Sequence, residues 1–571
     1  MIAVRGTSIV GGLLVATLLM GPVLFGYSAP TTATGRHSAS SIPGLNQDGI
    51  PAAGEPIVIT AEPTPLDANP SGDQVLRLAG PVDGPETLDP ARSRDLASAF
   101  LVRQIFRGLV GFDADLEPIP ELAERIEVSA DGLDYTFTLR SAVAFHDGSP
   151  IDAGDVVESL TRALRPDTVG GNANALGGPT FLSDIEGAAE VVAGDAIILR
   201  GLEAFDERTV RIRLSAPRST FLMKLASAPA SIVDPEQIAN DSEWWRTPNG
   251  SGPFFVADWA EAEQLTLEPF ERYHTGEPPL NRVDILLGAN AQQSFNLYQA
   301  GEIDIDSVGI NVLDRVMAPE SGLRDEVSVT PLFAANYIAF RTDVEPMDDP
   351  MIRRAVQLGF PREKVALVTY DGYVEPAAGL VPHGMLGEDW PVDGLPYDLN
   401  AAREAVAQSR YGSAENVPPI RIYLASGSGA ESLRDVLSSD LGLTVEVIAI
   451  DWAEFMDGLS QRQYSAYELY WGADFPDPET FLWTLFGTGR ADNYIDYSNT
   501  AFDELLEQAA AEQDVGRRSS VYAQAQQVLM DDLMLIPLYY DVAYTITKPY
   551  VRNLNVTPLG ILRLETVWLE S

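Results

Sequence analysis

Apolar residues recur at strand and helix spacing through most of the chain after residue 73. Alternating apolar positions in "QVLRLAG", "RTVRIRLSAP", "QLTLEPF" and "RVDILL" predict strands. In "SAFLVRQIFRGLVGF", helical spacing joins Phe100, Leu101, Ile105 and Leu109, and the glycines near its end indicate a stop. A later helix, "AQQSFNLYQAG", is expected to end on Gly301.

In the second half of the chain, segments with helical spacing of apolar residues alternate with segments with strand spacing. Helices are predicted for "DPMIRRAVQLGF", "DLNAAREAVAQS", "AFDELLEQAAAEQ" and "VGRRSSVYAQAQQVLMDD". Strands are predicted for "IRIYLAS", "TVEVIAI", "LIPLYYDVAYTITK" and "LRLETVWLE". Alternation of strands and helices over this length predicts an α/β architecture with more than one lobe.

The N-terminal pattern is different. Arg5 precedes about twenty uncharged, mostly apolar residues, which is long for a signal-peptide core and just long enough to span a bilayer. Residues 1–28 are therefore predicted to be a signal peptide or an uncleaved membrane anchor, and both place the rest of the chain outside the cytoplasm. Residues 29–72, rich in Pro, Ser, Thr, Ala and Gly, are predicted to be a flexible linker.

Charge and composition exclude some kinds of binding partner and some kinds of reactive site. The net charge of -45 argues against nucleic acid and acidic membrane surfaces as partners, because both need basic faces. With no cysteine, the chain has no disulfide, thiolate metal site or cysteine nucleophile. Its 45% hydrophobic content predicts that most of it folds.

Catalytic motifs are missing from the sequence. The four histidines lie far apart without an HExxH pattern, and His146 in "FHDG" is interpreted as structural. "GGNANALGG" lacks the lysine of a phosphate loop, and Ser426 replaces the first glycine of a hydrolase elbow. A catalytic pair of carboxylates like that of a glycosidase has no sequence motif of this kind, so the sequence does not reveal whether one is present. The chain is therefore predicted to bind a ligand rather than catalyse a reaction, with no metal and no cofactor.

Four stretches in order resemble one family. They are "ETLDPARSRDLASAFLVRQIFRGLVGFD", "NGSGPFFVADWAEAEQLTLEPFERYHTGEPPLNRVDILL", "NYIAFRTDVEPMDDPMIRRAVQLGF" and "YWGADFPDPETFLWTLF". Together with the residues between them they are similar to the family 5 extracytoplasmic solute-binding proteins of ABC importers. That family delivers peptides, and sometimes nickel or other solutes, to a permease.

The resemblance implies a two-lobed, hinged α/β fold of the type II periplasmic-binding-protein kind over residues 73–571. Lobe I is expected at about 73–337 and 541–571, with an extra subdomain inserted at about 113–226, and lobe II at about 338–540. A peptide would lie extended between the lobes, held by strand-like main-chain hydrogen bonds.

Asp474 matches the family's aspartate that grips the peptide's α-amino group, and Trp471 matches a ring on the same wall, beside Gly472. A carboxylate among aromatic rings normally needs a partner, and the resemblance implies that the ligand's ammonium supplies it. The alternative is that Asp474 caps a turn or meets an arginine of this chain. Asp477, followed by Pro478, is interpreted instead as a structural helix N-cap.

Weaker correspondences add three site residues. Tyr337 matches a site-lining tyrosine, with core packing as an equal alternative, and Arg94 and Leu96 fall in a loop that runs beside the ligand. Glu468 stands where some oligopeptide binders carry arginine, which leaves the anchoring of the ligand's C-terminus open.

The expected function is therefore peptide capture outside the cytoplasm, without catalysis, by a monomer that works with ABC permease subunits. The N-terminal segment or the permease would hold it at the membrane. Alternatives are another solute (an oligosaccharide, an opine-like compound or a nickel chelate), a binder that works without a permease, and a secreted two-carboxylate hydrolase.

Overall fold

The computed structural model describes residues 57–61, 70, 72–82, 84–171, 175–387, 392 and 394–570. The predicted signal peptide or anchor, and most of the predicted linker, lie outside these residues. No helix in the described ranges is long and apolar enough to cross a membrane.

One eleven-stranded sheet organises the described chain. Ten of its strands follow the order β16-β15-β17-β13-β18-β12-β2-β11-β10-β9, and the eleventh, β14, pairs with β18. Along that order the bounds are Val445–Ala449, Ile420–Leu424, Ala466–Gly472, Val327–Phe340, Leu535–Thr547, Ile305–Ser307, Val75–Ala79, Arg282–Leu286, Gln264–Pro269 and Phe254–Ala260, with β14 at Glu375–Pro376.

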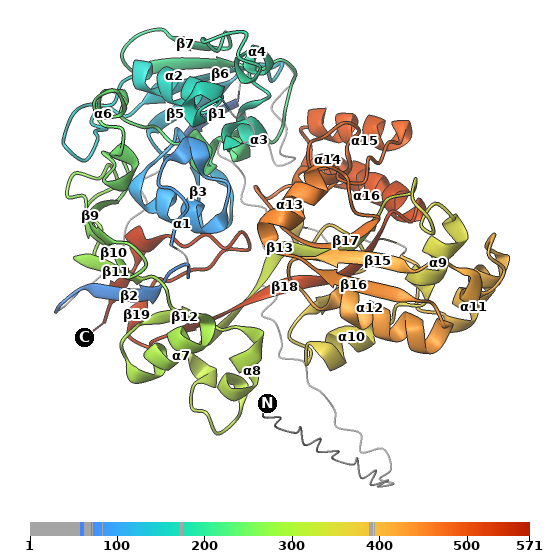
Figure 1. The fold of residues 1–571 in the computed structure, drawn as a ribbon. Helices are drawn as coiled ribbons and strands as arrows, with labels where there is room; N and C mark the ends of the chain where they lie inside the picture. Colours follow the sequence, from blue (N-terminus) through green and yellow to red (C-terminus); the bar gives the residue numbers. More distant parts are fainter. Residues whose placement is uncertain are drawn as a thin grey trace, which may run out of the picture. The chain divides into compact units, whose positions relative to one another are not determined.

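Strands β13 and β18 are the longest in the sheet and join its two halves (Figure 1). They pair antiparallel from Val327 opposite Ile546 to Ala339 opposite Leu535, with register shifts after Pro331 and Asn336. On one side of this pair lie β12, β2 and β9–β11, and on the other lie β15–β17. This is a two-lobed α/β fold in which two strands run from one lobe into the other.

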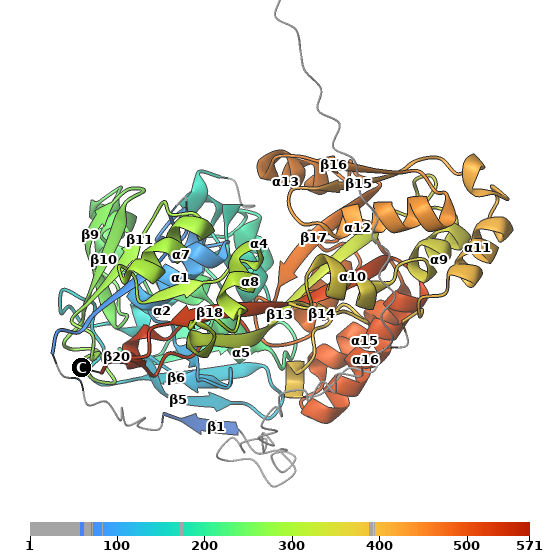
Figure 2. The same ribbon diagram turned by 90° about the horizontal axis from the view of Figure 1, so that it is seen from below.

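A separate five-stranded antiparallel sheet has the order β1-β5-β6-β8-β7. Its strands span Ile57–Thr60, Ala123–Val128, Asp134–Leu139, Thr209–Arg213 and Leu202–Ala204. Figure 2 shows β1 at the outer edge of this sheet, beside β5.

Strand β1 corrects one prediction. Its four residues fall in the range expected to be a flexible linker, but they pair with β5 from Ile57 opposite Val128 to Thr60 opposite Arg125. Ile59 is buried in the core of this sheet, and an apolar "IVIT" run is suited to a strand with one covered face. The linker prediction is therefore wrong at these positions.

Sixteen helices pack around the two sheets in the described part of the chain. Their bounds from α1 to α16 are Leu96–Ile105, Ala153–Arg162, Gly178–Leu182, Ala188–Val192, Phe221–Leu225, Pro235–Asn240, Ala291–Ala300, Ile310–Met317, Pro350–Leu358, Arg362–Thr369, Leu399–Gln408, Gly429–Val436, Trp452–Ser460, Glu479–Phe486, Thr500–Ala511 and Val515–Asp531. In lobe II, α13–α16 lie on one face of the sheet and α9–α12 on the other (Figure 1).

Two predicted elements are shorter than their apolar patterns. The helix predicted around residue 100 ends at Ile105, and Val110–Phe112 forms strand β3, which pairs with β4 at Pro118–Pro120. Near the C-terminus, only Trp568–Leu569 is a strand, β20, paired with β19 at Val551–Arg552. Some of the apolar residues in these patterns are buried in segments without regular secondary structure. Periodicity alone therefore overestimated the lengths of the two elements.

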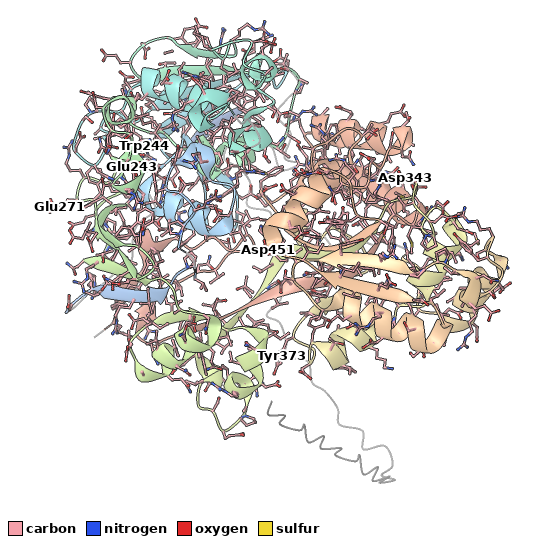
Figure 3. All side chains as sticks on the ribbon, viewed as in Figure 1. Glu243, Trp244, Glu271, Asp343, Tyr373 and Asp451 are labelled. Atoms are coloured by element: carbon pink, nitrogen blue, oxygen red, sulfur yellow. The ribbon has the colours of Figure 1, made fainter. Side chains whose placement is uncertain are left out.

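A polar contact outside the main sheet also joins the two lobes. Tyr373, labelled in Figure 3, follows α10 and donates a hydrogen bond of 2.8 Å to Asp314 on α8. Its ring meets that of Tyr544 on β18 at 5.7 Å, edge to face. These contacts lie beside the strands that run between the lobes.

Candidate functional site

Asp474 lies in the turn between β17 and α14. Strand β17 ends at Gly472, and the N–H of Ala473 donates to the carbonyl of Phe333 on β13 at 2.8 Å. Helix α14 begins at Glu479, after Pro478. The turn is thus fixed to the strand on one side and to the helix on the other, which places the carboxylate in a defined position.

The Asp474 side chain is half-buried and surrounded by protein groups. Thr480, in the first turn of α14, donates its hydroxyl to Oδ2 at 3.0 Å and accepts the N–H of Asp474 at 3.0 Å. Burial raises the pKa of Asp474 to about 7, and the charge of Asp492 adds to the effect against the opposing influence of Thr480 and Lys224. A raised pKa means that the surroundings of a carboxyl group stabilise its negative charge less well than water does.

The nearby cation is already committed to other carboxylates. Lys224 Nζ, on α5, lies 2.8 Å from Asp184 Oδ2 and 2.6 Å from Glu479 Oε1, and it sits 5.5 Å from the centre of the Phe475 ring. Within the described ranges no ion pair involves Asp474. Among the described residues, therefore, no arginine holds Asp474, which was one alternative open at the level of sequence.

Trp471 and Gly472 precede Asp474 at the end of β17, and both are half-buried. The Trp471 ring packs at the edge of the core between β17 and α13–α16. Its indole nitrogen is buried and has no hydrogen-bond partner among the described residues. The unused Trp471 N–H thus lies three residues before the Asp474 carboxylate, which accepts from Thr480 but has no ion-pair partner among the described residues.

Tyr337 is placed differently from the site interpretation. It is 1% exposed, and its ring lies 6.4 Å from that of Tyr467 and 6.2 Å from that of Phe486. The side chain faces α13–α16 inside the lobe II core. In this conformation Tyr337 packs in the core, which was the alternative left open, and its place beside a ligand stays a prediction.

Arg94 and Leu96 are both exposed at the start of α1, and Leu96 is 66% exposed. Asp95 between them caps the helix by accepting the N–H of Ser98 at 2.8 Å. The pKa of Tyr494 is raised mainly by burial and by Asp492, and the charge of Arg94 opposes this rise. The charge of Arg94, in lobe I, therefore influences Tyr494 in lobe II. Tyr494 is also influenced by Asp492, the carboxylate whose charge helps to raise the pKa of Asp474.

Asp477 is a structural residue, as its sequence position predicts. Its Oδ1 accepts the N–H of Glu479, the first residue of α14, at 3.0 Å, and its Oδ2 lies 3.0 Å from Arg518 Nη2 on α16. Pro478, rather than Asp477, occupies the N-cap position itself. Both charged side chains of the pair are almost fully buried.

Replacing Asp477 with alanine is expected to lower the free energy of unfolding by about 3 to 5 kcal/mol, because it leaves a buried, unpaired guanidinium. Urea denaturation followed by circular dichroism measures the change. The double variant Asp477→Ala/Arg518→Met should recover part of the loss, whereas two simply additive losses would show that the ion pair is not what stabilises this turn.

Three contributors to the site were not identified from the sequence. Lys224 and Asp492 come from segments that carry no motif. Glu479 lies in the fourth family-like stretch, but its partner Lys224 lies more than 250 positions away in the chain. His146 is structural, as predicted: Nδ1 accepts from Gly250 N–H, Nε2 lies 3.1 Å from the Gly252 carbonyl, and burial lowers its pKa to about 4. No cluster of metal-ligating side chains was found in the described part of the chain.

Comparison with known proteins defines the class. Residues 117–493 match the family described as bacterial extracellular solute-binding proteins, family 5. The match covers more than half of the chain, and the chain belongs to this family.

Curated relatives agree with this assignment, and a solved structure agrees with the fold. A probable deoxycholate-binding periplasmic protein of Escherichia coli, YgiS, is 29% identical over 507 residues, covering 86% of this chain and 92% of the relative. The oligopeptide-binding protein OppA of Bacillus subtilis is 26% identical, covering 82% and 88%. The structure of the Escherichia coli murein tripeptide-binding protein MppA superposes with a TM-score of 0.74 at 23% identity, covering 88% and 99%, which supports the fold.

Proposed function

We propose that this protein is the substrate-binding component of an ABC importer that captures peptides outside the cytoplasm, and that Asp474 binds the α-ammonium group of the peptide. The observation that carries the proposal is the Asp474 carboxylate itself, half-buried, raised in pKa and without an ion-pair partner among the described residues. A ligand cation supplies the missing charge.

The electrostatics of the site favour an ammonium over a neutral group. A hydrogen bond between a carboxylate and an ammonium is stronger than one between neutral groups, and partial burial strengthens it further. The α-amino group of a peptide has an ordinary pKa near 8, so it is protonated at the pH where Asp474 ionises. Trp471 N–H adds a donor suited to a ligand carbonyl.

Other ligands fit the site less well. A bile acid anion, the ligand in the name of YgiS, would bring a further negative charge to the two carboxyl groups of Asp474 and Asp492. A neutral oligosaccharide would leave the carboxylate unpaired, and a nickel chelate would find few histidines. Turnover of a glycoside would identify a hydrolase instead of a transport protein.

Peptide binding by this chain requires no reaction on the ligand. The family and the relatives named periplasmic support an extracytoplasmic location. In our proposal residues 1–28 anchor the protein or direct its export, a monomer receives the peptide between its lobes, and the permease takes it up. Contacts from both lobes to one ligand favour the closed state, because only differential affinity shifts such an equilibrium.

A ligand panel tests the proposed function by isothermal titration calorimetry. The panel contains a free tripeptide, its N-acetylated copy, a disaccharide and deoxycholate. We expect the free tripeptide to bind, the acetylated copy to bind about 30- to 1000-fold more weakly, and the other two not to bind. Equal binding of free and acetylated peptide, or preferential binding of deoxycholate, would contradict the proposal.

A further inference from the structure

A second polar region lies on the face of the lobe II sheet opposite Tyr337. Asn336 on β13 stands directly across from Tyr470 on β17 and from Tyr539 on β18. Residues opposite one another in antiparallel strands share a face, as do residues two apart in one strand. Glu468 and Asp541 therefore belong to the same face, and we call these five residues the Asn336 face.

The Asn336 side chain is only 6% exposed, and its Nδ2 has no hydrogen-bond partner among the described residues. Buried amide donors are normally satisfied, because an unmade hydrogen bond costs about 1 to 3 kcal/mol. Tyr470 beside it is 38% exposed, so this face reaches solvent. The unsatisfied amide donor next to an open edge points to a ligand carbonyl.

Glu468 occupies the N-terminus of α12, where a ligand anion would otherwise bind. Its Oε1 accepts the N–H of Gly429 at 3.1 Å and its Oε2 accepts the N–H of Ala430 at 2.6 Å. A Cβ on Gly427, whose φ is +109°, would lie 2.3 Å from Oε1, so the loop closes tightly over the carboxylate. An internal acid thus fills this position and makes the face unfavourable to a ligand carboxylate.

Neither acid of this face has a cationic partner. No ion pair involves Glu468 or Asp541 within the described ranges, and Asp541 is half-buried with one oxygen accepting the N–H of Val542 at 2.9 Å. Burial raises the pKa of Glu468 to about 7 and also raises the pKa of Asp541. Both carboxyl groups are therefore short of compensating charge.

Aromatic rings complete the face. The rings of Tyr539 and Tyr370 are in contact, tilted by 51° with their centres 4.6 Å apart, and Tyr370 accepts a hydrogen bond of 3.0 Å from Ser428, which precedes α12. Tyrosine rings attract cations through their π faces, an effect that grows when the cation is desolvated. Acids and rings together make an environment for a positive group.

We propose that the Asn336 face binds a basic side chain of the peptide, with Asp541 as the carboxylate that contacts the cation and Asn336 donating to a carbonyl of the peptide main chain. Glu468 acts from behind, by its charge and by closing the α12 N-terminus to anions. This inference rests on the proposed function, and it narrows the ligand class to peptides that carry lysine or arginine.

The spacing suits a residue close to the peptide's N-terminus. Tyr470 and Asp474 are four residues apart in the chain, so their Cα atoms lie at most about 15 Å from each other. An extended peptide advances about 3.3 Å per residue. The second and third positions of a peptide held at Asp474 fall within this upper limit, so both positions are tested.

Calorimetry with matched tripeptides tests this inference. Ala-Lys-Ala, Ala-norleucine-Ala and Ala-Glu-Ala, and the same three side chains at the third position, differ in charge at nearly constant size. We expect the better lysine peptide to bind at least tenfold more tightly than its norleucine copy, and the glutamate peptides to bind most weakly. In Asp541→Asn the lysine preference should fall to less than threefold, and in Glu468→Gln it should fall partly.

Asp435→Asn, an exposed change on α12, is the control and should keep the full preference. Thermal unfolding of each variant establishes that it is folded. Equal affinity for lysine, norleucine and glutamate peptides would overturn the inference while leaving amine recognition intact, and so would a lysine preference that survives in both Asp541→Asn and Glu468→Gln. If no peptide binds, or if acetylation has no effect, the proposed function itself fails and this inference with it.

Discussion

Asp474→Asn is expected to weaken the binding of a peptide with a free α-amino group by about 30- to 1000-fold, or about 2 to 4 kcal/mol. The substitution keeps the size of the side chain and its acceptor for Thr480, but removes the negative charge that the ligand's ammonium completes. Titration calorimetry with one tripeptide measures the change. The exposed substitution Glu504→Gln on α15 is the matched control and should leave the affinity unchanged.

The same variant should be more stable than the wild type when no ligand is present. The ordinary pKa of Asp474 is 3.8 and its folded value is about 7, so between pH 4 and pH 7 the folded protein binds more protons than the unfolded chain. Stability contributed by this group therefore falls as pH rises through that window.

We expect Asp474→Asn to match the wild type in free energy of unfolding at pH 4 and to exceed it by about 2 to 4 kcal/mol at pH 8. Denaturant titrations at the two pH values measure the difference. A variant that is less stable than the wild type at pH 8 would show that the carboxylate has a stabilising partner within the chain.

The second prediction with a large expected effect concerns pH. The affinity for a peptide with a free α-amino group is expected to fall about tenfold per pH unit below pH 7. In the empty protein Asp474 takes up a proton near pH 7, mainly because it is buried, and the ligand's ammonium must displace that proton. Above about pH 8 the affinity should fall again as the peptide amine loses its own proton. Affinity measured from pH 5 to pH 9 should therefore pass through a maximum between about pH 7 and 8.

Glu468 also titrates near pH 7, so the variant comparison is needed to assign the acid limb of this profile. In Asp474→Asn the tenfold slope below pH 7 should disappear for a peptide without basic side chains. A slope that persists unchanged in the variant would assign the titration to a different group.

Much of the fold followed from local patterns in the sequence. Alternation located β2 and β11, and helical spacing with a terminal glycine located α7, which ends at Ala300 and is capped by Gly301 in the left-handed conformation. The edge strand β1 was missed, because four apolar residues inside a proline-rich segment give no periodic signal before their partner β5 is known. Strand pairing over long sequence separation is the part that local patterns do not contain.

The candidate site was predicted only in part. Asp474 was singled out from a resemblance, and its role toward a ligand stays a prediction. The alternation of β13 does not by itself say which face carries Tyr337 and which carries Asn336. The charge balance around Asp474 depends on Lys224 and Glu479, whose contact exists only in the folded chain. The sequence therefore does not show which residues contact one another in the folded site.

A double-mutant cycle between the ligand and the protein tests amine recognition most directly. Calorimetry would compare wild type and Asp474→Asn, each with a free and an N-acetylated copy of one tripeptide. If the α-ammonium pairs with Asp474, removing either partner costs about 2 to 4 kcal/mol and removing the second costs little more, so the coupling energy is at least about 2 kcal/mol. Two independent losses that add, with a coupling energy near zero, would contradict the pairing.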